Sequence, residues 1–468
     1  MAKLLNFLRK PSRCYNIIRI FATFSRFTKI KYMLKPQFKH LCLLFAAAII
    51  ALSSCTKKDI AHPLDAIGNN ADAVALAKPV DLIKATGESS LSGLARYLNE
   101  ESYSQIEKIK DIKGLDFDLV GVAKYKALKS PVIIMASKDR GELEKSLKDN
   151  YGNAESNDSL SIFIDARNGL GFVVNDDYLY VMPASNADEA TDAVATMAQQ
   201  LAAGPLAPWK RNILTEDNML NALAAQDNVC LSMALNCTAK DFDLNVINRD
   251  ATDGTPSNFL PEGSYAYAND CASHIKKNSL FSFALAKIDL SKISIPRSAG
   301  ISRAQLTMLQ AFVAGPCYAN VEFTGDDPTD FGKLAINGAI TSSSPQVAAV
   351  MLSGVSRECS RSGLPVSSSP AGLSISYDDA MLKVATEGDR LTFKTEYQTS
   401  SPSISASELD GCIFRAAVNL PAKLNKQLND AEFGLKAQLK VKDNSVQLKG
   451  EFTDTEASIF ENLAKIFK

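Results

Sequence analysis

The chain has 468 residues, 46% of them hydrophobic, so it has ample apolar material for a packed core and no composition typical of wholesale disorder. Its 51 Lys and Arg nearly balance 52 Asp and Glu, but residues 1–54 hold ten of the basic residues and none of the acidic ones. The remaining 414 residues therefore carry 41 basic against 52 acidic residues, a net charge of −11, which argues against general binding to nucleic acid or anionic lipid.

Residues 33–54 have the three parts of a secretory signal peptide: a positive start, an uncharged apolar run at 41–52, and small residues before a cysteine. The apolar run has 12 residues, whereas a helix that spans a bilayer needs about 20. The last four positions are similar to the lipobox of bacterial lipoproteins, namely Leu52, Ser53, Ser54 and Cys55. That resemblance implies a lipid such as palmitate on Cys55, cleavage before it, and anchoring in the outer membrane.

Residues 1–32 carry eight Lys or Arg and no acidic residue. Because a complete signal begins at Met33, this segment is interpreted as a mis-assigned upstream start, and a basic arm for nucleic acid is the alternative. Residues 55–70 are predicted to form a polar tether. The sequence leaves open whether the protein faces the periplasm or the cell surface.

A first α+β domain is predicted over 71–205 from apolar periodicity. Strands are expected at 73–78, 117–123, 132–135 and 160–165, with a hairpin at 169–182; helices are expected from Pro79, at 91–109, at 139–150 and at 187–201. Two prolines in 202–210 predict a domain boundary there. The chain's single tryptophan, Trp209, lies in this segment and is interpreted as a packing side chain.

A second α+β domain is predicted over 210–468. Strands are expected at 229–236, 281–287, 317–323, 333–341 and 412–419, with hairpins at 381–398 and 434–452; helices are expected at 217–225, 301–312, 345–356 and 455–467; loops are expected at 248–263 and 360–372. The fold class is therefore α+β, with antiparallel sheets, helices packed on one face, and two related domains.

Two pairs of segments predict an internal duplication. ALAKPVDLIK (75–84) is similar to ALAKIDLSK (284–292), and ALNCTAK (234–240) is similar to AVNLPAK (417–423). A hairpin followed by a helix also recurs, at 169–201 and at 434–467. Chance similarity between short strand–turn–helix segments is the alternative.

The lipobox, the strand at 73–77 and the following Leu82, Lys84 and Gly87 together resemble a family of uncharacterised Bacteroidetes lipoproteins, with a domain of unknown function that follows the lipid anchor. The resemblance would cover most of 71–468. It implies an envelope location and this fold, and it implies no activity.

Six cysteines remain after the lipidated one, and all lie after residue 229: Cys230, Cys237, Cys271, Cys317, Cys359 and Cys412. An even number in an exported protein permits disulfides, but six cysteines allow 15 connectivities and the sequence does not select one. Buried free thiols that pack as small apolar side chains are the equal alternative.

Sequence motifs for catalysis are lacking. Only His62 and His274 follow the signal, no triad or metal-ligand spacing is evident, and the GDDPTDFGK segment (325–333) departs from a phosphate-binding loop. No metal, cofactor or nucleic-acid partner is predicted. The expected function is a non-catalytic, lipid-anchored envelope protein with a binding or structural role toward an envelope protein or glycan. The alternatives are an exported hydrolase of glycan or peptide with a carboxylate site, and a carrier of an apolar ligand.

The lipid anchor can be tested directly. Cys55→Ala removes the thiol that would accept the diacylglycerol, so the variant should remain unprocessed and should incorporate no labelled palmitate. Synthesis from Met33 should give the same processed protein as synthesis from Met1. Palmitate incorporation that persists in the variant would contradict the assignment.

Overall fold

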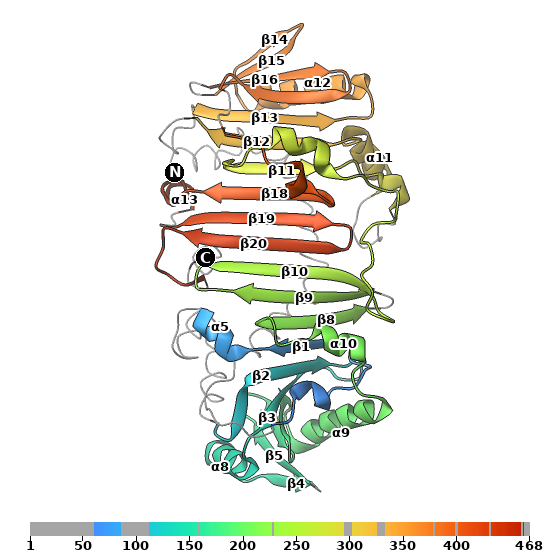
Figure 1. Ribbon diagram of the computed structural model, residues 1–468, viewed down its shortest axis with the longest axis vertical. Coiled ribbons are helices and arrows are strands. Elements are labelled where there is room, and N and C mark those ends of the chain that lie inside the picture. The colour runs from blue at the N-terminus through green and yellow to red at the C-terminus, as the bar shows by residue number, and fades with distance from the viewer. Residues whose placement is uncertain are drawn as a thin grey trace. The chain divides into compact units, whose positions relative to one another are not determined.

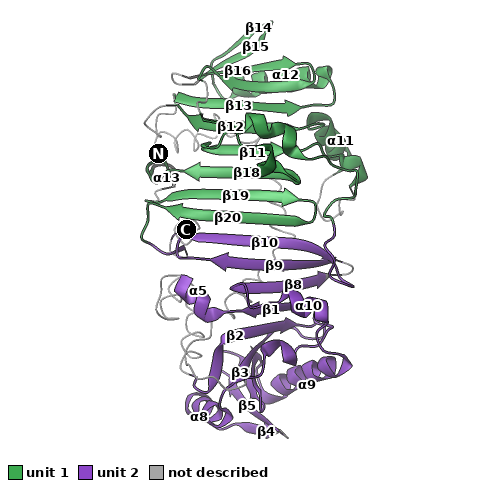
Figure 2. Ribbon diagram, viewed as in Figure 1, with its two compact units in different colours: residues 1–36, 258–456 green, residues 37–257, 457–468 purple. Residues whose placement is uncertain are grey.

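The structure is a computed structural model that describes residues 60–85, 112–157, 159–226, 229–293, 302–324, 333–377, 380–397, 401–429, 432–459 and 462. It divides into two compact units. Unit 1 comprises residues 1–36 and 258–456, and unit 2 comprises residues 37–257 and 457–468, as coloured in Figure 2. The predicted boundary segment 202–210 lies inside unit 2. The expected helix at 91–109 and most of that at 455–467 fall outside the described residues.

Unit 2 contains ten antiparallel strands and flanking helices within the described residues (Figure 1). The strands are β1 (Ala73–Ala77), β2 (Leu115–Lys124), β3 (Val132–Ser137), β4 (Glu155–Asn157), β5 (Leu160–Asp165), β6 (Leu170–Val174), β7 (Tyr178–Pro183), β8 (Leu220–Gln226), β9 (Val229–Cys237) and β10 (Asp241–Asp250). The helices are the 3₁₀ helix η2 (Pro63–Ala66), α5 (Pro79–Ala85), α8 (Arg140–Tyr151), α9 (Ala187–Ala203) and α10 (Pro208–Ile213). Pairing gives the strand order β4-β5-β6-β7-β3-β2-β1-β8-β9-β10.

Alternation along the strands of unit 2 builds two cores. Tyr180 and Val181 are consecutive on β7 and therefore point to opposite faces of the sheet. Tyr180 packs in the cluster that contains Val194 of α9, and Val181 packs in the cluster that contains Leu143 of α8. In this part of the sheet the two longer helices thus lie on opposite faces. The side chain of Asp139 caps α8 by accepting a hydrogen bond from the Glu142 amide, so the helix begins one residue after the expected start at 139.

Unit 1 has its own antiparallel strands: β11 (Phe281–Leu285), β12 (Cys317–Phe323), β13 (Leu334–Thr341), β14 (Val366–Ser369), β15 (Gly372–Tyr377), β16 (Ala380–Glu387), β17 (Arg390–Thr395), β18 (Cys412–Leu420), β19 (Gly434–Lys442) and β20 (Ser445–Thr453). Its helices are the 3₁₀ helices η3 (Ala268–His274), η4 (Leu290–Lys292) and η7 (Ala406–Leu409), with α11 (Arg303–Phe312), α12 (Pro345–Arg361) and α13 (Ala422–Asn429). The strand order is β14-β15-β16-β17-β13-β12-β11-β18-β19-β20. The α+β class with antiparallel sheets is confirmed.

The two units share one strand order, because adding ten to each strand number of unit 2 reproduces the order in unit 1. Single hydrogen bonds correspond as well. The amide of Leu206 donates to the Ile67 carbonyl in unit 2, and the amide of Ile404 donates to the Ile275 carbonyl in unit 1. Isolated bridges join Gly68 to Pro205 and Lys276 to Ser403. These pairs place η2 and β1 in correspondence with η3 and β11, 208 residues apart.

The sequence matches locate this correspondence only in part. The amides of Lys78 and Ala286 make equivalent bonds, so Ala77 corresponds to Leu285. The ALAK match instead pairs Ala77 with Ala286 and is wrong by one residue, which exchanges the two faces of the strand. The second match joins β9 to β18, although the strand order pairs β9 with β19. The hairpin β6–β7 likewise corresponds to β16–β17 and not to 434–452.

Several further elements differ from the prediction. Residues 217–225 were expected as a helix because Leu and Ala favour helices, but 220–226 form β8, which pairs with both β1 and β9. Leu220 and Ala222 are buried on one face of that strand. The strands β10, β14 and β15 and the helix α13 were not predicted. Phe242, Leu244 and Val246 of β10 alternate with polar residues, as do Leu373 and Ile375 of β15, so the signal for these two strands was present in the sequence and was missed.

The first described residues already belong to the core of unit 2. Leu64 and Ile67 are 1% and 0% exposed, and the Gly68 amide donates to the hydroxyl of Tyr125 at 2.9 Å. Residues 60–70, predicted as tether, therefore contribute to the core. Trp209 packs against the same cluster, and a Cβ at Gly254 would lie 2.3 Å from its ring, so a backbone without a side chain is required there.

Truncation of Leu64 tests this packing. Leu64→Ala should lower the free energy of unfolding of unit 2 by about 2–5 kcal/mol, because it leaves a cavity in the core. Leu231, which is 38% exposed, provides the control, and Leu231→Ala should cost less than about 1 kcal/mol. Fluorescence of the single Trp209 during urea unfolding reports on this unit. Equal midpoints for the two variants would contradict the packing.

Candidate functional site

The sheet of unit 1 has one apolar face that is only partly buried. Residues paired directly across antiparallel strands point to the same side. Leu439 of β19 lies between Ala416 of β18 and Leu448 of β20, and Phe283 of β11 pairs with Ala416 on its other side. We name this surface the apolar face; the partly buried or exposed members on these strands are Phe281, Phe283, Leu285, Phe414, Ala416, Val418, Leu420, Leu435, Ala437, Leu439, Val441, Val446 and Leu448.

The opposite side of β19 and β20 is charged. Lys436, Lys440 and Lys449 alternate with the apolar residues, and Lys436 pairs with Glu451 at 3.5 Å. The corresponding strands of unit 2 repeat the apolar side. Met233 of β9 lies between Ala222 and Val246, and Leu235 lies between Leu220 and Leu244. Each unit therefore presents an amphipathic sheet.

A small polar cavity lies on the other side of the unit 1 sheet, beneath η3. Its volume is about 50 Å³, and its lining residues come from η3, β12, β13 and β17, namely Asp270, Cys271, His274, Pro316, Tyr318, Ala339, Thr341 and Arg390. The rings of His274 and Tyr318 stack with centroids 4.2 Å apart and planes 4° from parallel. The sequence singled out His274 and Cys271, and it missed Tyr318 and Arg390.

Burial and positive charge control the ionisation of this cavity. Desolvation, followed by Arg390 and Lys276, lowers the pKa of His274. Desolvation, with the neighbouring Cys317, raises the pKa of Cys271 to about 12. His274 is therefore neutral at pH 7, and Cys271 is a protonated thiol, which lacks the thiolate form that reactive cysteines use.

The six cysteines are buried as free thiols: Cys230 and Cys237 in unit 2, and Cys271, Cys317, Cys359 and Cys412 in unit 1. Desolvation raises the pKa of each, to about 11 for Cys237 and for Cys317. They occupy core positions as small apolar side chains do. The disulfide pairing that the sequence allows stays a prediction.

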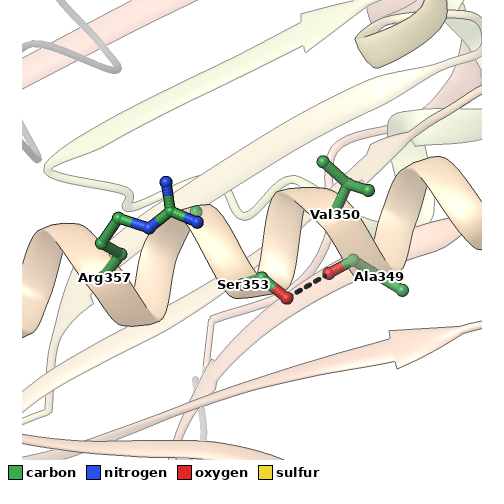
Figure 3. Close-up of a pocket in the computed structure, with 5 residues that line it drawn as sticks. Ala349, Val350, Ser353 and Arg357 are labelled. Carbon is green, nitrogen blue, oxygen red and sulfur yellow. Dashed lines mark hydrogen bonds between the residues drawn. The ribbon is translucent and has the colours of Figure 1, made fainter.

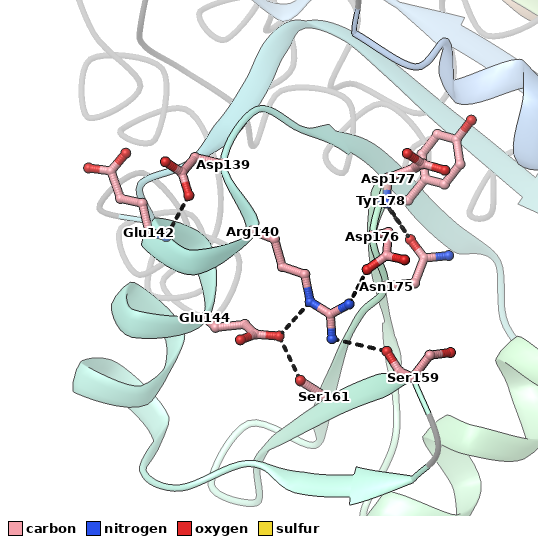
Figure 4. Close-up of polar contacts among 10 residues, drawn as sticks. All are labelled: Asp139, Arg140, Glu142, Glu144, Ser159, Ser161, Asn175, Asp176, Asp177 and Tyr178. Atoms are coloured by element: carbon pink, nitrogen blue, oxygen red, sulfur yellow. Dashed lines mark hydrogen bonds and ion pairs between the residues drawn. The ribbon is translucent and has the colours of Figure 1, made fainter.

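Two carboxylates converge on one guanidinium in unit 2. Arg140 at the start of α8 pairs with Glu144 at 2.8 Å and with Asp176 of the β6–β7 turn (Figure 4). Desolvation raises the pKa of Glu144, but hydrogen bonds from Ser161 and Arg140 outweigh it and the net pKa is lowered. A general acid needs a raised pKa, so this network fixes α8 to the strands and does not form an acid–base pair.

A hollow of about 380 Å³ lies along the outer side of α12 in unit 1. Figure 3 shows its lining side chains on one helix, Ala349, Val350, Ser353 and Arg357, with Gly354 completing the set. The Ser353 hydroxyl donates to the Ala349 carbonyl of its own helix at 3.0 Å. An exposed row of small residues on one helix does not define a site.

Several predicted features lie outside the described residues: the lipobox with Cys55, and most of the rejected phosphate-loop segment, 325–332. His62 lies in unit 2, where its Nδ1 accepts from the Leu64 amide at 3.1 Å. The described residues contain no cluster of three possible metal ligands. Within the described ranges, no helix has both the length and the apolar character needed to cross a bilayer.

No protein family matches the sequence, and no curated protein is significantly similar to it. Among solved structures, there is distant similarity to TP0453. Its crystal form I has 12% sequence identity and a TM-score of 0.23, over 75% of this chain and 96% of that chain. Its crystal form III has 12% identity and a TM-score of 0.20, over 75% of this chain and 97% of that chain. Similarity at this level assigns neither family nor function.

The lowered pKa of His274 gives a pH prediction. His274 should titrate below its ordinary value of 6.5, so between pH 6.5 and its folded pKa the folded state binds fewer protons than the unfolded state. Stability that depends on this group is therefore lost as the pH falls through that range. NMR of ¹³C-labelled histidine should show a midpoint below 6.5 for the signal that His274→Phe removes. A midpoint at or above 6.5 would contradict the burial of the ring.

Proposed function

We propose that this protein is a non-catalytic envelope protein, held by a lipid on Cys55, that binds an apolar ligand or partner on its sheet surfaces. The observation that carries the proposal is the apolar face of unit 1, with its counterpart in unit 2. Side chains such as Phe283, Val418 and Leu439 form a continuous surface that remains only partly buried. Large partly exposed apolar surfaces of this kind are typical of interaction sites.

The position of the anchor supports a role close to a membrane. Only residues 56–59 separate Cys55 from Ile60, where the described part of unit 2 begins, so five Cα–Cα steps join the two. Five residues span at most about 18 Å when fully extended. A lipid on Cys55 would therefore keep unit 2 within this distance of the bilayer surface.

The polar sites support the absence of catalysis. The cavity at His274 has a volume of about 50 Å³, which suits a few atoms and not a glycan or peptide. Its histidine stacks on an aromatic ring, and the carboxylates Glu144 and Asp176 both pair with Arg140. These observations give the hydrolase alternative no support, whereas the apolar face favours the carrier alternative.

The common strand order supports an origin of the two units by duplication. Two copies of one sheet would present two apolar surfaces of similar construction. Ligand binding by both units follows from this proposal, with each surface contributed by its own strands.

The apolar face can be tested by exchanging a single side chain. Leu439→Gln should weaken binding of a fluorescent fatty acid about fivefold, because loss of apolar contact over part of a leucine side chain costs about 1 kcal/mol. Lys440→Gln is the matched control, since Lys440 is the next residue on the same strand and points to the opposite side. Fluorescence titration of the processed protein gives the affinities.

Circular dichroism melting would establish that both variants are folded. Equal affinity for the two variants would contradict an apolar ligand site on this face. Absence of saturable binding by the parent protein would contradict it as well. Release of product from glycan or peptide substrates by the parent protein would contradict the non-catalytic assignment separately.

A further inference from the structure

The polar cavity of unit 1 has a counterpart position in unit 2 that is filled. The Ser137 amide donates to the Asp177 carbonyl, and the Ser342 amide donates to the Asp389 carbonyl, so Tyr178 of unit 2 corresponds to Arg390 of unit 1. The strand pairs agree, because Tyr178 lies opposite Ala136 as Arg390 lies opposite Thr341. The same position therefore carries an aromatic residue in unit 2 and a cation in unit 1.

The other residues that line the cavity are also more polar than their counterparts in unit 2. The 208-residue correspondence of η2 and η3 relates Pro63 to Cys271 and Ala66 to His274. The pairing of Asp72 with Lys124 and of Leu280 with Val321 relates Gly121 to Tyr318. In unit 2, Pro63 fills the space above Gly121, where an added Cβ would be 2.9 Å from it.

The unit 2 position belongs to a packed core. Ala66, Ile134 and Tyr178 are 3%, 0% and 8% exposed in one apolar cluster. At the corresponding place, unit 1 has a polar-lined cavity of about 50 Å³ with Arg390 at its edge. Packed interiors leave few spaces larger than one water molecule, so a cavity of this size at one copy only indicates a use specific to unit 1.

The charges around the cavity indicate the sign of a ligand. Arg390 lines it beside the neutral His274, and the electrostatic effect of Arg390 reaches His274, Tyr318 and Cys271. Lys276 acts on His274 in the same sense. Asp270 lines the cavity, and Glu387 acts on Tyr318 from the paired strand. Among the described residues, Arg390 has no ion-pair partner, whereas the Lys276 ammonium donates to Ser403 at 3.0 Å.

We propose that this cavity binds a small anionic group, a carboxylate or a phosphate, through the Arg390 guanidinium and the His274 ring. A planar fork of donors matches both oxyanions, and the cavity is of the size of a group of three to five heavy atoms. The site is separate from the apolar face, which lies on the other side of the sheet. The proposal does not depend on the function proposed for that face.

The experiment uses the processed protein labelled with ¹³C-histidine, titrated with sodium phosphate or sodium acetate at constant ionic strength set by sodium chloride. Each anion should shift the His274 signal in a saturable manner. Arg390→Gln should weaken this binding about tenfold, as expected for loss of a charge-assisted hydrogen bond. Arg357→Gln is the control, since Arg357 is exposed on α12 and lines only the outer hollow.

Tighter binding of phosphate would assign the ligand to phosphate esters, and tighter binding of acetate would assign it to carboxylates. A His274 signal that neither anion shifts in a saturable manner would overturn the proposal. Equal affinities in the parent protein and in a folded Arg390→Gln variant would overturn it as well. Equal loss in the Arg357→Gln control would reveal general charge screening and would also overturn it.

Discussion

The alternation of side chains along paired antiparallel strands is the constraint on which the rest of the structure depends. Once the partner of a strand is fixed, every second residue points to the same side, and a shift of one residue exchanges the two sides. Leu439 and Lys440 illustrate the result, since adjacent positions of β19 contribute to an apolar and a charged surface. The surface proposed to bind a ligand therefore exists only if the register is correct.

The same constraint explains how two copies of one fold have come to differ. Backbone hydrogen bonds at Ile67 and Ile275, and at Gly68 and Lys276, retain the same connections in both units. Side chains between these fixed points can change without altering the pairing. Tyr178 lies in the packed core of unit 2, whereas Arg390 at the corresponding position of unit 1 lies at the edge of a polar cavity. Apolar sheet surfaces are common to both units, and the polar cavity is described in unit 1 alone.

Much of the fold could be predicted because strong local patterns coincide with the elements. The charged segment 139–150 predicted α8, and the turn residues Asn175 to Asp177 between two apolar runs predicted the β6–β7 hairpin. The β8 segment could not be predicted, since its Leu and Ala residues favour a helix and only pairing with β1 and β9 makes it a strand. Two related domains were predicted from similar short segments. The correct correspondence between the residues of the two units follows from backbone hydrogen bonds, which the sequence does not record.

The candidate sites were less accessible to sequence reasoning. His274 and Cys271 are visible as neighbours in the chain, but Arg390 joins them only through the pairing of β13 with β17. The apolar face is assembled from β11, β18, β19 and β20, which are distant in sequence. An alignment of the two units on their strand order identifies the cavity position, because it compares Tyr178 with Arg390 directly.

The central claim is that the apolar face holds a ligand, and photo-crosslinking in the living cell tests it most directly. A benzoylphenylalanine placed at Leu439 projects from that face, and one placed at Lys440 projects from the charged side. The account predicts that irradiation attaches a small apolar molecule, visible as an added mass on the intact protein, at Leu439 and not at Lys440. Crosslinks from Leu439 that reach only other segments of the same chain would contradict it.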